Sequence, residues 1–478
     1  MMLLAKAAEV LDGYLVFPDA VEHVQGMSIS AVSSDSRKLS SGDLFVALRG
    51  EHFDGYEFIA QAAQSGAIAA LVNKDSVELD VARNQGAEAA HAITLLVVED
   101  TRLALGRLAA YWRQQFAIPL IAITGSNGKT TVKEMLASIL RVAAGNDAAV
   151  LATQGNLNND IGVPLTLLGM NAQHRYAVIE MGMNHPGEID YLTHLACPDV
   201  ALINNASGAH LQGLGSVEAV ARAKSEIFSG LKAQGMAVIN SDDEYAPLWR
   251  SLIGTCALLE FGLDEQADVS GSYQAHGAGL ELFVQAPSGH FSAMLQVPGE
   301  HNARNALAAS AAAIALNVPL AVIASGLQNF SGVPGRLQRK QASCGATLID
   351  DSYNANPASL LAAISVLAQA DGKRVLVLGD MGELGNDAVR LHAEIGKAAR
   401  QSGIDGLYAV GELSRHAVHE FGQGAQHFES LEALLAALVE RLDAQTTVLV
   451  KGSRFMKMER VVKYLERHAH DAHSSALH

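Results

Sequence analysis

The sequence is poor in cysteine. Its three cysteines, Cys197, Cys256 and Cys344, are scattered along 478 residues. An odd and widely spaced set excludes a disulfide framework and the paired spacing of a structural zinc site. This usage is typical of a chain kept in a reducing compartment.

Positive charge is also scarce. The 34 lysines and arginines are outnumbered by 50 aspartates and glutamates, which gives a formal net charge of −16. Such a balance argues against nucleic acid or an anionic membrane as a partner. An anionic substrate would then need local cations, so individual lysines and arginines in special places become informative.

Long hydrophobic segments of the kind that enter membranes are missing. The N-terminus has neither the basic start nor the apolar core of a signal peptide. The apolar run 307–324 is mostly alanine and is interrupted by Asn317 and Pro319. We therefore expect no membrane insertion and a cytoplasmic location.

Length and overall composition favour a multidomain enzyme. A chain of 478 residues exceeds one ordinary core and predicts two to four domains. With 49% hydrophobic and 5% aromatic residues it is typical of an alanine-rich α/β protein.

One stretch predicts a phosphate-binding loop. The apolar run 121–123 precedes a glycine-bracketed turn and a Lys-Thr pair, and a helix is expected from Val132 to Leu140. Backbone N–H groups at such a helix start face an anion, the lysine adds charge, and the threonine hydroxyl suits Mg²⁺. Ile123 stands where the strict Walker pattern has glycine, so a plain glycine turn before a helix is the alternative. The candidate ligands are Gly125, Ser126, Asn127, Gly128, Lys129, Thr130 and Thr131.

Alternating strand and helix patterns predict three α/β domains. We expect a small N-terminal domain over residues 1–85, a central domain over 86–318 built on a mostly parallel sheet, and a C-terminal Rossmann-like domain over 319–478. The polar, Glu/Ala-rich segment 75–92 suggests the first boundary, and the strand 95–98 is assigned to the central domain. The histidine-rich tail 468–478 predicts disorder rather than a metal site.

Three residues after the phosphate loop are candidates for a metal site. Glu180 ends a buried strand, where an acid could bind a hard cation beside the loop. His210 follows another strand, and Lys224 lies on the next helix. Locally each has an ordinary alternative: a strand-ending surface acid, a structural histidine and a solvated lysine.

Further polar clusters are candidates for substrate contacts. The run Ser33–Arg37 could hold a nucleotide diphosphate, the amide-rich loop 153–160 could contact substrate, and Asn302 with Asn305 could read adenine. Turns and helix starts explain the same residues equally well. In the last third, Arg336 lies in a loop and residues 350–357 follow a strand.

Taken in order, these motifs resemble the Mur ligase family, the ATP-dependent amide-bond ligases of peptidoglycan precursor assembly. The resemblance rests on residues 35–37, 42–47 and 54–55, on the loop 124–131, and on the motifs around Glu180, Asn302 and Arg336. It implies that Ser36 and Arg37 bind a UDP-linked substrate and that Asn302, Asn305, Arg336 and Asp351 join the loop in binding ATP. It also implies two Mg²⁺ sites formed by Thr130, Glu180, His210 and Lys224.

Within the family, the runs 153–168, 350–357 and 378–385 are most similar to the member that adds the terminal dipeptide, D-alanyl-D-alanine, to a UDP-muramoyl-tripeptide. The candidate substrate residues there are Thr153, Asn156, Asn159, Tyr353, Asn354 and Asn356. A sibling ligase, a folylpolyglutamate synthase or a P-loop ATPase without ligase activity remain the alternatives.

The resemblance also implies a mechanism. The tripeptide carboxylate attacks the γ-phosphate of ATP, and the dipeptide amine displaces phosphate from the acyl phosphate. Lys129, Lys224, His210 and Arg336 are the expected catalytic residues, and Lys224 is expected to carry a CO₂-derived carbamate. We further expect a monomer that closes its domains around the reactants.

Overall fold

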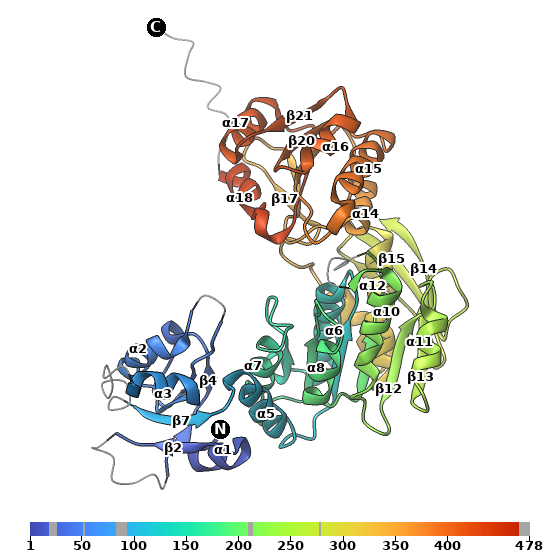
Figure 1. Cartoon of the computed structure of the whole chain (residues 1–478). Helices are drawn as coiled ribbons and strands as arrows, with labels where there is room; N and C mark the ends of the chain where they lie inside the picture. Colours follow the sequence, from blue (N-terminus) through green and yellow to red (C-terminus); the bar gives the residue numbers. More distant parts are fainter. Residues whose placement is uncertain (19–25, 51–52, 83–92, 209–213, 277–278, 468–478) are drawn as a thin grey trace.

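The computed structural model describes residues 1–18, 26–50, 53–82, 93–208, 214–276 and 279–467. Figure 1 shows three α/β bodies arranged in chain order, with the central body between the other two. Among the described helices, none is both long and apolar enough to cross a bilayer. The expected division into three α/β domains is confirmed.

The N-terminal body is built on a sheet with the strand order β2-β7-β6-β5-β4. Strands β4 to β7 run parallel, and β2 pairs antiparallel with β7 at the edge. Its elements are β1 (Met2–Leu3), α1 (Leu4–Leu11), β2 (Tyr14–Val16), β3 (Ser28–Ile29), β4 (Val32–Ser33), η1 (Ser36–Lys38), β5 (Leu44–Val46), η2 (Gly55–Phe58), α2 (Ile59–Gln64), β6 (Ala69–Asn73), α3 (Lys74–Ala82) and β7 (Thr94–Val98).

The first domain boundary lies later than we expected. Strand β7 pairs along its whole length with β6, from Ala69 opposite Thr94 to Asn73 opposite Val98. All five of its residues are buried in this sheet. The boundary expected at residue 85 is therefore corrected to the end of β7, because β7 is a strand of the N-terminal sheet.

The central body contains nine described strands in the order β16-β15-β14-β13-β12-β11-β8-β10-β9. Strands β8 to β14 run parallel, and β15 and β16 extend the sheet through antiparallel pairing with β14 and with each other. The elements up to β11 are α5 (Thr101–Arg113), β8 (Leu120–Thr124), α6 (Lys129–Ala144), η3 (Asp147–Ala149), β9 (Val150–Ala152), α7 (Gly162–Leu168), β10 (Tyr176–Glu180), α8 (Glu188–Ala196) and β11 (Val200–Ile203). Those that follow are α10 (Val217–Ser225), η4 (Glu226–Phe228), β12 (Met236–Asn240), α11 (Ala246–Leu252), β13 (Ala257–Gly262), β14 (Val269–His276), β15 (Gly279–Ala286), β16 (Gly289–Leu295), α12 (Glu300–Ala315) and α13 (Leu320–Gln328).

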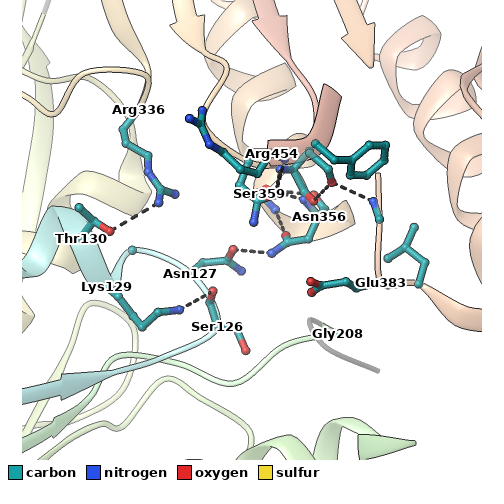
Figure 2. Close-up of a pocket in the computed structure, with 17 residues that line it drawn as sticks. Ser126, Asn127, Lys129, Thr130, Gly208, Arg336, Asn356, Ser359, Glu383 and Arg454 are labelled. Atoms are coloured by element: carbon teal, nitrogen blue, oxygen red, sulfur yellow. Dashed lines mark hydrogen bonds between the residues drawn. The ribbon is translucent and has the colours of Figure 1, made fainter. Parts of the chain in front are cut away.

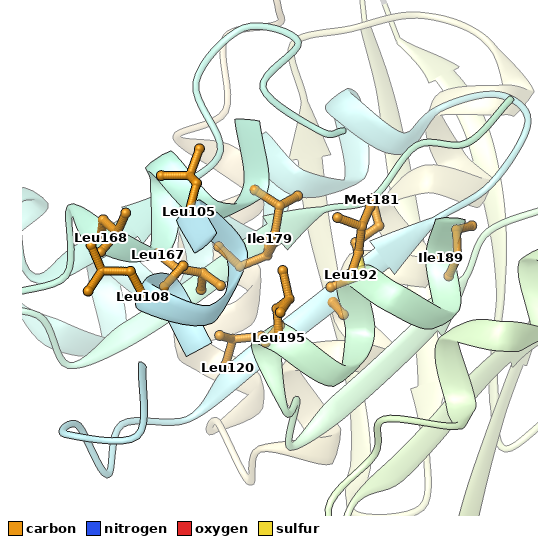
Figure 3. Close-up of a cluster of buried hydrophobic side chains, with 14 of the residues drawn as sticks. Leu105, Leu108, Leu120, Leu167, Leu168, Ile179, Met181, Ile189, Leu192 and Leu195 are labelled. Atoms are coloured by element: carbon orange, nitrogen blue, oxygen red, sulfur yellow. The ribbon is translucent and has the colours of Figure 1, made fainter. Parts of the chain in front are cut away.

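Helices cover both faces of this sheet and fix the strand ends that form the site. On one face, α5, α7 and α8 pack leucines and isoleucines against β8 and β10 (Figure 3). On the other, α6, α12 and α13 form a second buried cluster. Helix α13 packs on α6 and β16, so it belongs to the central body. The boundary expected at residue 318 is thus corrected to the linker between α13 and β17.

The C-terminal body is a six-stranded sheet in the order β17-β18-β22-β19-β20-β21, parallel except for the edge strand β17. Its elements are β17 (Gln338–Gln341), β18 (Thr347–Asp351), α14 (Pro357–Ala368), β19 (Lys373–Gly379), η5 (Gly385–Asp387), α15 (Ala388–Gln401), β20 (Gly406–Val410), α16 (Ser414–Phe421), β21 (Ala425–Phe428), α17 (Leu431–Arg441), β22 (Thr446–Lys451), η6 (Arg454–Met456) and α18 (Glu459–Arg467). The tail 468–478, for which we expected disorder, lies outside the described residues.

Candidate active site

The phosphate loop forms as the sequence indicates. Strand β8 runs through the buried Ile123 to Thr124, and α6 begins at Lys129. Gly128 has φ +78, and a Cβ there would lie 2.3 Å from Asn305 Oδ1. Only glycine fits this turn, because it accepts the left-handed backbone and leaves room for the amide. The absent Walker glycine is explained by a strand that continues through position 123.

Lys129 and Thr130 are held at the start of α6. The Lys129 ammonium donates to the carbonyl of Gly125 at 2.6 Å. Burial lowers the pKa of Lys129, and the Glu180 carboxylate opposes that shift. The Thr130 hydroxyl donates to Glu180 Oε2 at 2.9 Å. Glu180, only 2% exposed at the end of β10, therefore lies beside the loop as expected.

Two further residues fix Glu180. Asn158 Nδ2 donates to Glu180 Oε1 at 2.8 Å, and the Thr153 hydroxyl accepts from the Glu180 backbone N–H at 2.9 Å. Thr153 is 1% exposed and its carbonyl also accepts from the buried Lys133 at 2.6 Å. Thr153, which we predicted as a substrate residue, thus supports the backbone of Glu180, and it is not among the residues that line a cavity with Asn156 and Asn159.

Lys224 is a buried cation near the phosphate loop. It is 2% exposed on α10, and no hydrogen bond or ion pair to its ammonium occurs within the described part of the chain. Burial lowers the pKa of Lys224 well below that of an ordinary lysine, and the charge of Lys129 lowers it further. His210, the expected partner, lies outside the described residues.

A cavity of about 500 Å³ lies between α12 and the C-terminal body. Its wall includes Asn302 and Asn305 from α12 and Asp351 from the end of β18. Asn305 Oδ1 accepts from Asn204 Nδ2 at 3.0 Å, and Asn302 Nδ2 donates to the carbonyl of Pro298 at 2.7 Å. The three residues expected at the nucleoside end of ATP are therefore gathered on one cavity.

The acid in this cavity has a partner that the motifs did not indicate. Lys451, at the end of β22 and 2% exposed, forms an ion pair with Asp351 Oδ2 and donates to the carbonyl of Asn354 at 3.0 Å. Burial lowers the pKa of Lys451, and the Asp351 charge opposes this. Nearby, the buried His301 Nε2 has no hydrogen-bond partner among the described residues, so the cavity retains an unmet polar group.

A second cavity, of about 440 Å³, opens directly over the phosphate loop (Figure 2). Arg336 reaches into it from the linker between the bodies, with Nη2 at 3.5 Å from the Thr130 hydroxyl. Its buried Nε has no acceptor in the described part of the chain. Arg336 thus faces the loop as expected.

The C-terminal body touches the loop through Asn356. Its Nδ2 donates to Asn127 Oδ1 at 2.8 Å, while its Oδ1 accepts from the Ser359 backbone N–H at 2.8 Å as the N-cap of α14. Both ends of the amide are occupied, so Asn356 is placed as a link between bodies rather than as a free substrate ligand. Tyr353 and Asn354, the other expected substrate residues here, line a third cavity with Asn156 and Asn159.

The residues expected to bind the UDP-linked substrate, Ser36 and Arg37, lie in the N-terminal body. Ser36 donates to Gln61 Oε1 at 2.9 Å, and Arg37 forms a two-point ion pair with Asp35. The Arg37 hydrogen bonds hold the pKa of Asp35 at about 2. Neither Ser36 nor Arg37 lines any of the three cavities described above.

The donor set fits the groups that the resemblance implies. The glycine turn, Lys129 and Arg336 line one cavity. The buried His301 Nε2 and Arg336 Nε have no hydrogen-bond partner among the described residues, so a bound nucleotide could supply one. Thr130 and Glu180 offer oxygens of the kind that Mg²⁺ prefers. No cluster of three or more His, Cys, Asp or Glu suited to a metal occurs in the described ranges, and His210 lies outside them.

Comparison with known proteins gives consistent matches along the chain. Residues 28–113 match the Mur ligase family catalytic domain, residues 123–313 the Mur ligase middle domain, and residues 335–454 the Mur ligase, glutamate ligase domain. A protein of Escherichia coli named UDP-N-acetylmuramoyl-tripeptide--D-alanyl-D-alanine ligase is 43% identical over 97% of this chain and 98% of its own. The Bacillus subtilis protein of the same name is 36% identical over 96% and 97%.

Solved structures agree. MurF from Acinetobacter baumannii matches with a TM-score of 0.87 and 37% identity, covering 98% of this chain and 99% of its own. MurF ligase from Thermotoga maritima in complex with ADP matches with a TM-score of 0.77 and 27% identity, covering 93% and 98%. With full-length relatives above 30% identity and a shared three-body fold, this chain belongs to the Mur ligase family.

Proposed function

We propose that this chain uses ATP to join D-alanyl-D-alanine to UDP-N-acetylmuramoyl-tripeptide, which yields the pentapeptide precursor of peptidoglycan, ADP and phosphate. The observation that carries the proposal is the 43% identity, over nearly the full length of both chains, to a relative named for this reaction. The phosphate loop and the nucleoside cavity supply the ATP half of the reaction.

The reaction must bring two anions together. A carboxylate oxygen of the tripeptide attacks the γ-phosphorus, ADP leaves, and the dipeptide amine then attacks the acyl carbon and expels phosphate. Lys129 and Arg336 reduce the repulsion between the carboxylate and the γ-phosphate and stabilise the charge that spreads over its oxygens. Asn305 and Asp351 orient the nucleoside end of ATP.

Mg²⁺ belongs to the same proposal. Thr130 and Glu180 would hold it, and the ion would neutralise charge on the phosphates. Asn158 and Thr153 keep the Glu180 carboxylate in place, which supports its role as a ligand. Monomeric state and cytoplasmic location complete the proposal, and the free, half-buried cysteines are compatible with a reducing compartment.

Lys224 is proposed to react with CO₂ to form a carbamate. Only an uncharged amine attacks CO₂, and burial favours the uncharged form of this lysine. The product is an anion with two oxygens, which could contribute to the second metal site. His210 is proposed as its neighbour there.

Phosphate release tests the proposed function directly. Purified enzyme with ATP, Mg²⁺ and UDP-muramoyl-tripeptide is expected to release phosphate rapidly only after D-alanyl-D-alanine is added, with the pentapeptide seen by mass spectrometry. Lys129→Met is the control for contaminating activity. Release that ignores the dipeptide would favour a simple ATPase, and release with single amino acids alone would favour a sibling ligase.

A further inference from the structure

Two guanidinium groups lie near the Tyr353 ring. The Arg336 guanidinium carbon is 4.2 Å from the centroid of the Tyr353 ring, and that of Arg454 is 5.5 Å from it. Arg336 comes from the linker and Arg454 from the start of η6, and both line the cavity over the phosphate loop (Figure 2). Both guanidinium groups thus lie near one ring.

The two arginines differ in the contacts that they already make. Arg336 faces the phosphate loop through Thr130, as its proposed role requires. Arg454 pairs through Nη1 with Glu459 at 3.2 Å, and its side chain is 59% exposed. An exposed pair of this kind contributes at most about 1 kcal/mol, so a substrate carboxylate can replace Glu459 easily. Nε and Nη2 of Arg454 have no acceptor within the described ranges.

Among the described residues that line the third cavity, four are lysines or arginines: Arg102, Lys129, Arg336 and Arg454. Arg102 forms a close ion pair with Asp160, and Lys129 and Arg336 are proposed to bind the phosphates. Arg454 is held only by its exposed 3.2 Å pair with Glu459, so we assign it to another anion. In a chain with a net charge of −16, a cation left available beside the reacting groups is informative.

The spacing suits a dipeptide. Since both guanidinium carbons are measured from one ring centroid, they are no more than about 10 Å apart. A dipeptide spans about 6 to 7 Å from its amine to its carboxylate, and a single amino acid about half of that. A dipeptide whose amine lies near the γ-phosphate can therefore reach Arg454 with its carboxylate.

We propose that Arg454 binds the C-terminal carboxylate of the incoming dipeptide and so selects a two-residue acceptor with a free carboxyl end. The planar guanidinium offers two parallel N–H donors to that carboxylate. Tyr353 holds the guanidinium in place, and the Arg454 backbone N–H donates to Asn354 Oδ1 at 3.3 Å, which ties the two loops together. This inference rests on the proposed ligase function and names the residue that reads its second substrate.

The test pairs a substrate change with a residue change. Wild type and Arg454→Gln are assayed with D-alanyl-D-alanine and with its C-terminal amide. Wild type is expected to prefer the free acid by about 30- to 100-fold in kcat/KM, as for a charge-assisted pair. Arg454→Gln is expected to have its kcat/KM for the free acid lowered by that factor, so that it uses the acid and the amide about equally. Its KM for ATP should not change.

The controls separate charge recognition from folding. Arg415 pairs with Glu412 at 3.2 Å and is 54% exposed, much like Arg454, but lines none of the three cavities. Arg415→Gln should therefore keep the preference for the acid. Arg454→Lys should keep part of it, because the charge remains and the two-point geometry does not.

Two results would overturn the inference. If Arg454→Gln melts like wild type and still prefers the acid, Arg454 does not read the carboxylate, while the ligase function stands. If wild type does not use the dipeptide at all, the proposed function fails and this inference fails with it.

Discussion

Lys224 is a buried lysine of the central body, 2% exposed on α10. Burial lowers its pKa, the Lys129 charge lowers it further, and Asp243 opposes the shift. We expect Lys224→Ala to lose nearly all ligase activity, because the proposed carbamate oxygens are absent. Acetate or formate in the assay should restore part of the rate by filling the space left by the side chain. Full activity of the variant without added carboxylate would refute the role.

The same residue should make stability depend on pH. A lysine whose pKa is lowered in the folded state binds fewer protons there than in the unfolded chain. Its burial therefore lowers stability at neutral pH, and this cost falls as the pH rises towards 10.5. In CO₂-free buffer we expect Lys224→Met to be more stable than wild type at pH 7. Its advantage should shrink in denaturant melts at pH 9 and above. An advantage that does not change with pH would point to packing alone.

Individual residues could be predicted from the sequence where they belong to a local motif. Gly125, Lys129 and Thr130 could be predicted because the loop is contiguous, and Glu180 because it ends a buried strand. Lys451 and Asn158 could not, since each acts through a partner distant in sequence, Asp351 and Glu180. Thr153 faces the Glu180 backbone rather than the cavity, and a hydroxyl in an amide-rich loop does not reveal which way it points.

Helix α14 connects two bodies through its first turn. Asn356 caps the helix with Oδ1 and reaches the phosphate loop with Nδ2, so the two roles can be separated by substitution. Asn356→Asp keeps the cap and loses the donor, whereas Asn356→Ala loses both. We expect Asn356→Ala to lose about 1 kcal/mol of stability and Asn356→Asp to lose little.

Both Asn356 variants should lower kcat and raise the fraction of ATP hydrolysed without ligation, because the link to Asn127 is broken in each. Chemical melts and the ratio of phosphate to pentapeptide are the two measurements. Normal coupling in Asn356→Asp would show that the contact with the phosphate loop does not serve the reaction.

Element types were predictable, and their membership in sheets was not. The alternating pattern identified the strand at residues 95–98, and the polar segment before it suggested a domain boundary. Pairing with β6 is a tertiary property, and nothing in the local pattern of β7 distinguishes the last strand of one sheet from the first of the next. The local pattern does not predict the strand order of the central sheet either, because β8 lies between β10 and β11, which both come later in the chain.

The three bodies meet the reaction's need to exclude water from an acyl phosphate. One short segment, residues 329–337, connects the central and C-terminal bodies, and it carries Arg336. We propose that the C-terminal body closes on the phosphate loop and that this closure positions Arg336 and the α14 N-cap against the loop. A change in the linker should consequently affect catalysis through geometry more than through stability.

Gly335 is the residue where this can be measured. Its φ of +71 is a left-handed conformation, and an added Cβ would lie 3.4 Å from Tyr353 Cβ. Gly254 has φ +69 in a surface turn with open space around it, so it provides a matched control. Gly335→Ala and Gly254→Ala should each cost about 1 kcal/mol of stability. Only Gly335→Ala should also lower kcat, several-fold or more, because the backbone rotation turns Arg336 away from Thr130.

Small-angle X-ray scattering measures whether the whole molecule contracts when its ligands bind. Wild type and Gly254→Ala are expected to contract when UDP-muramoyl-tripeptide and a non-hydrolysable ATP analogue bind, and Gly335→Ala is expected to contract less. Stability alone cannot produce this difference, since both variants carry the same backbone strain. If the two glycine variants lost activity and contraction equally, the linker would be a passive connection, and the placement of Arg336 would have to come from the C-terminal body as a whole.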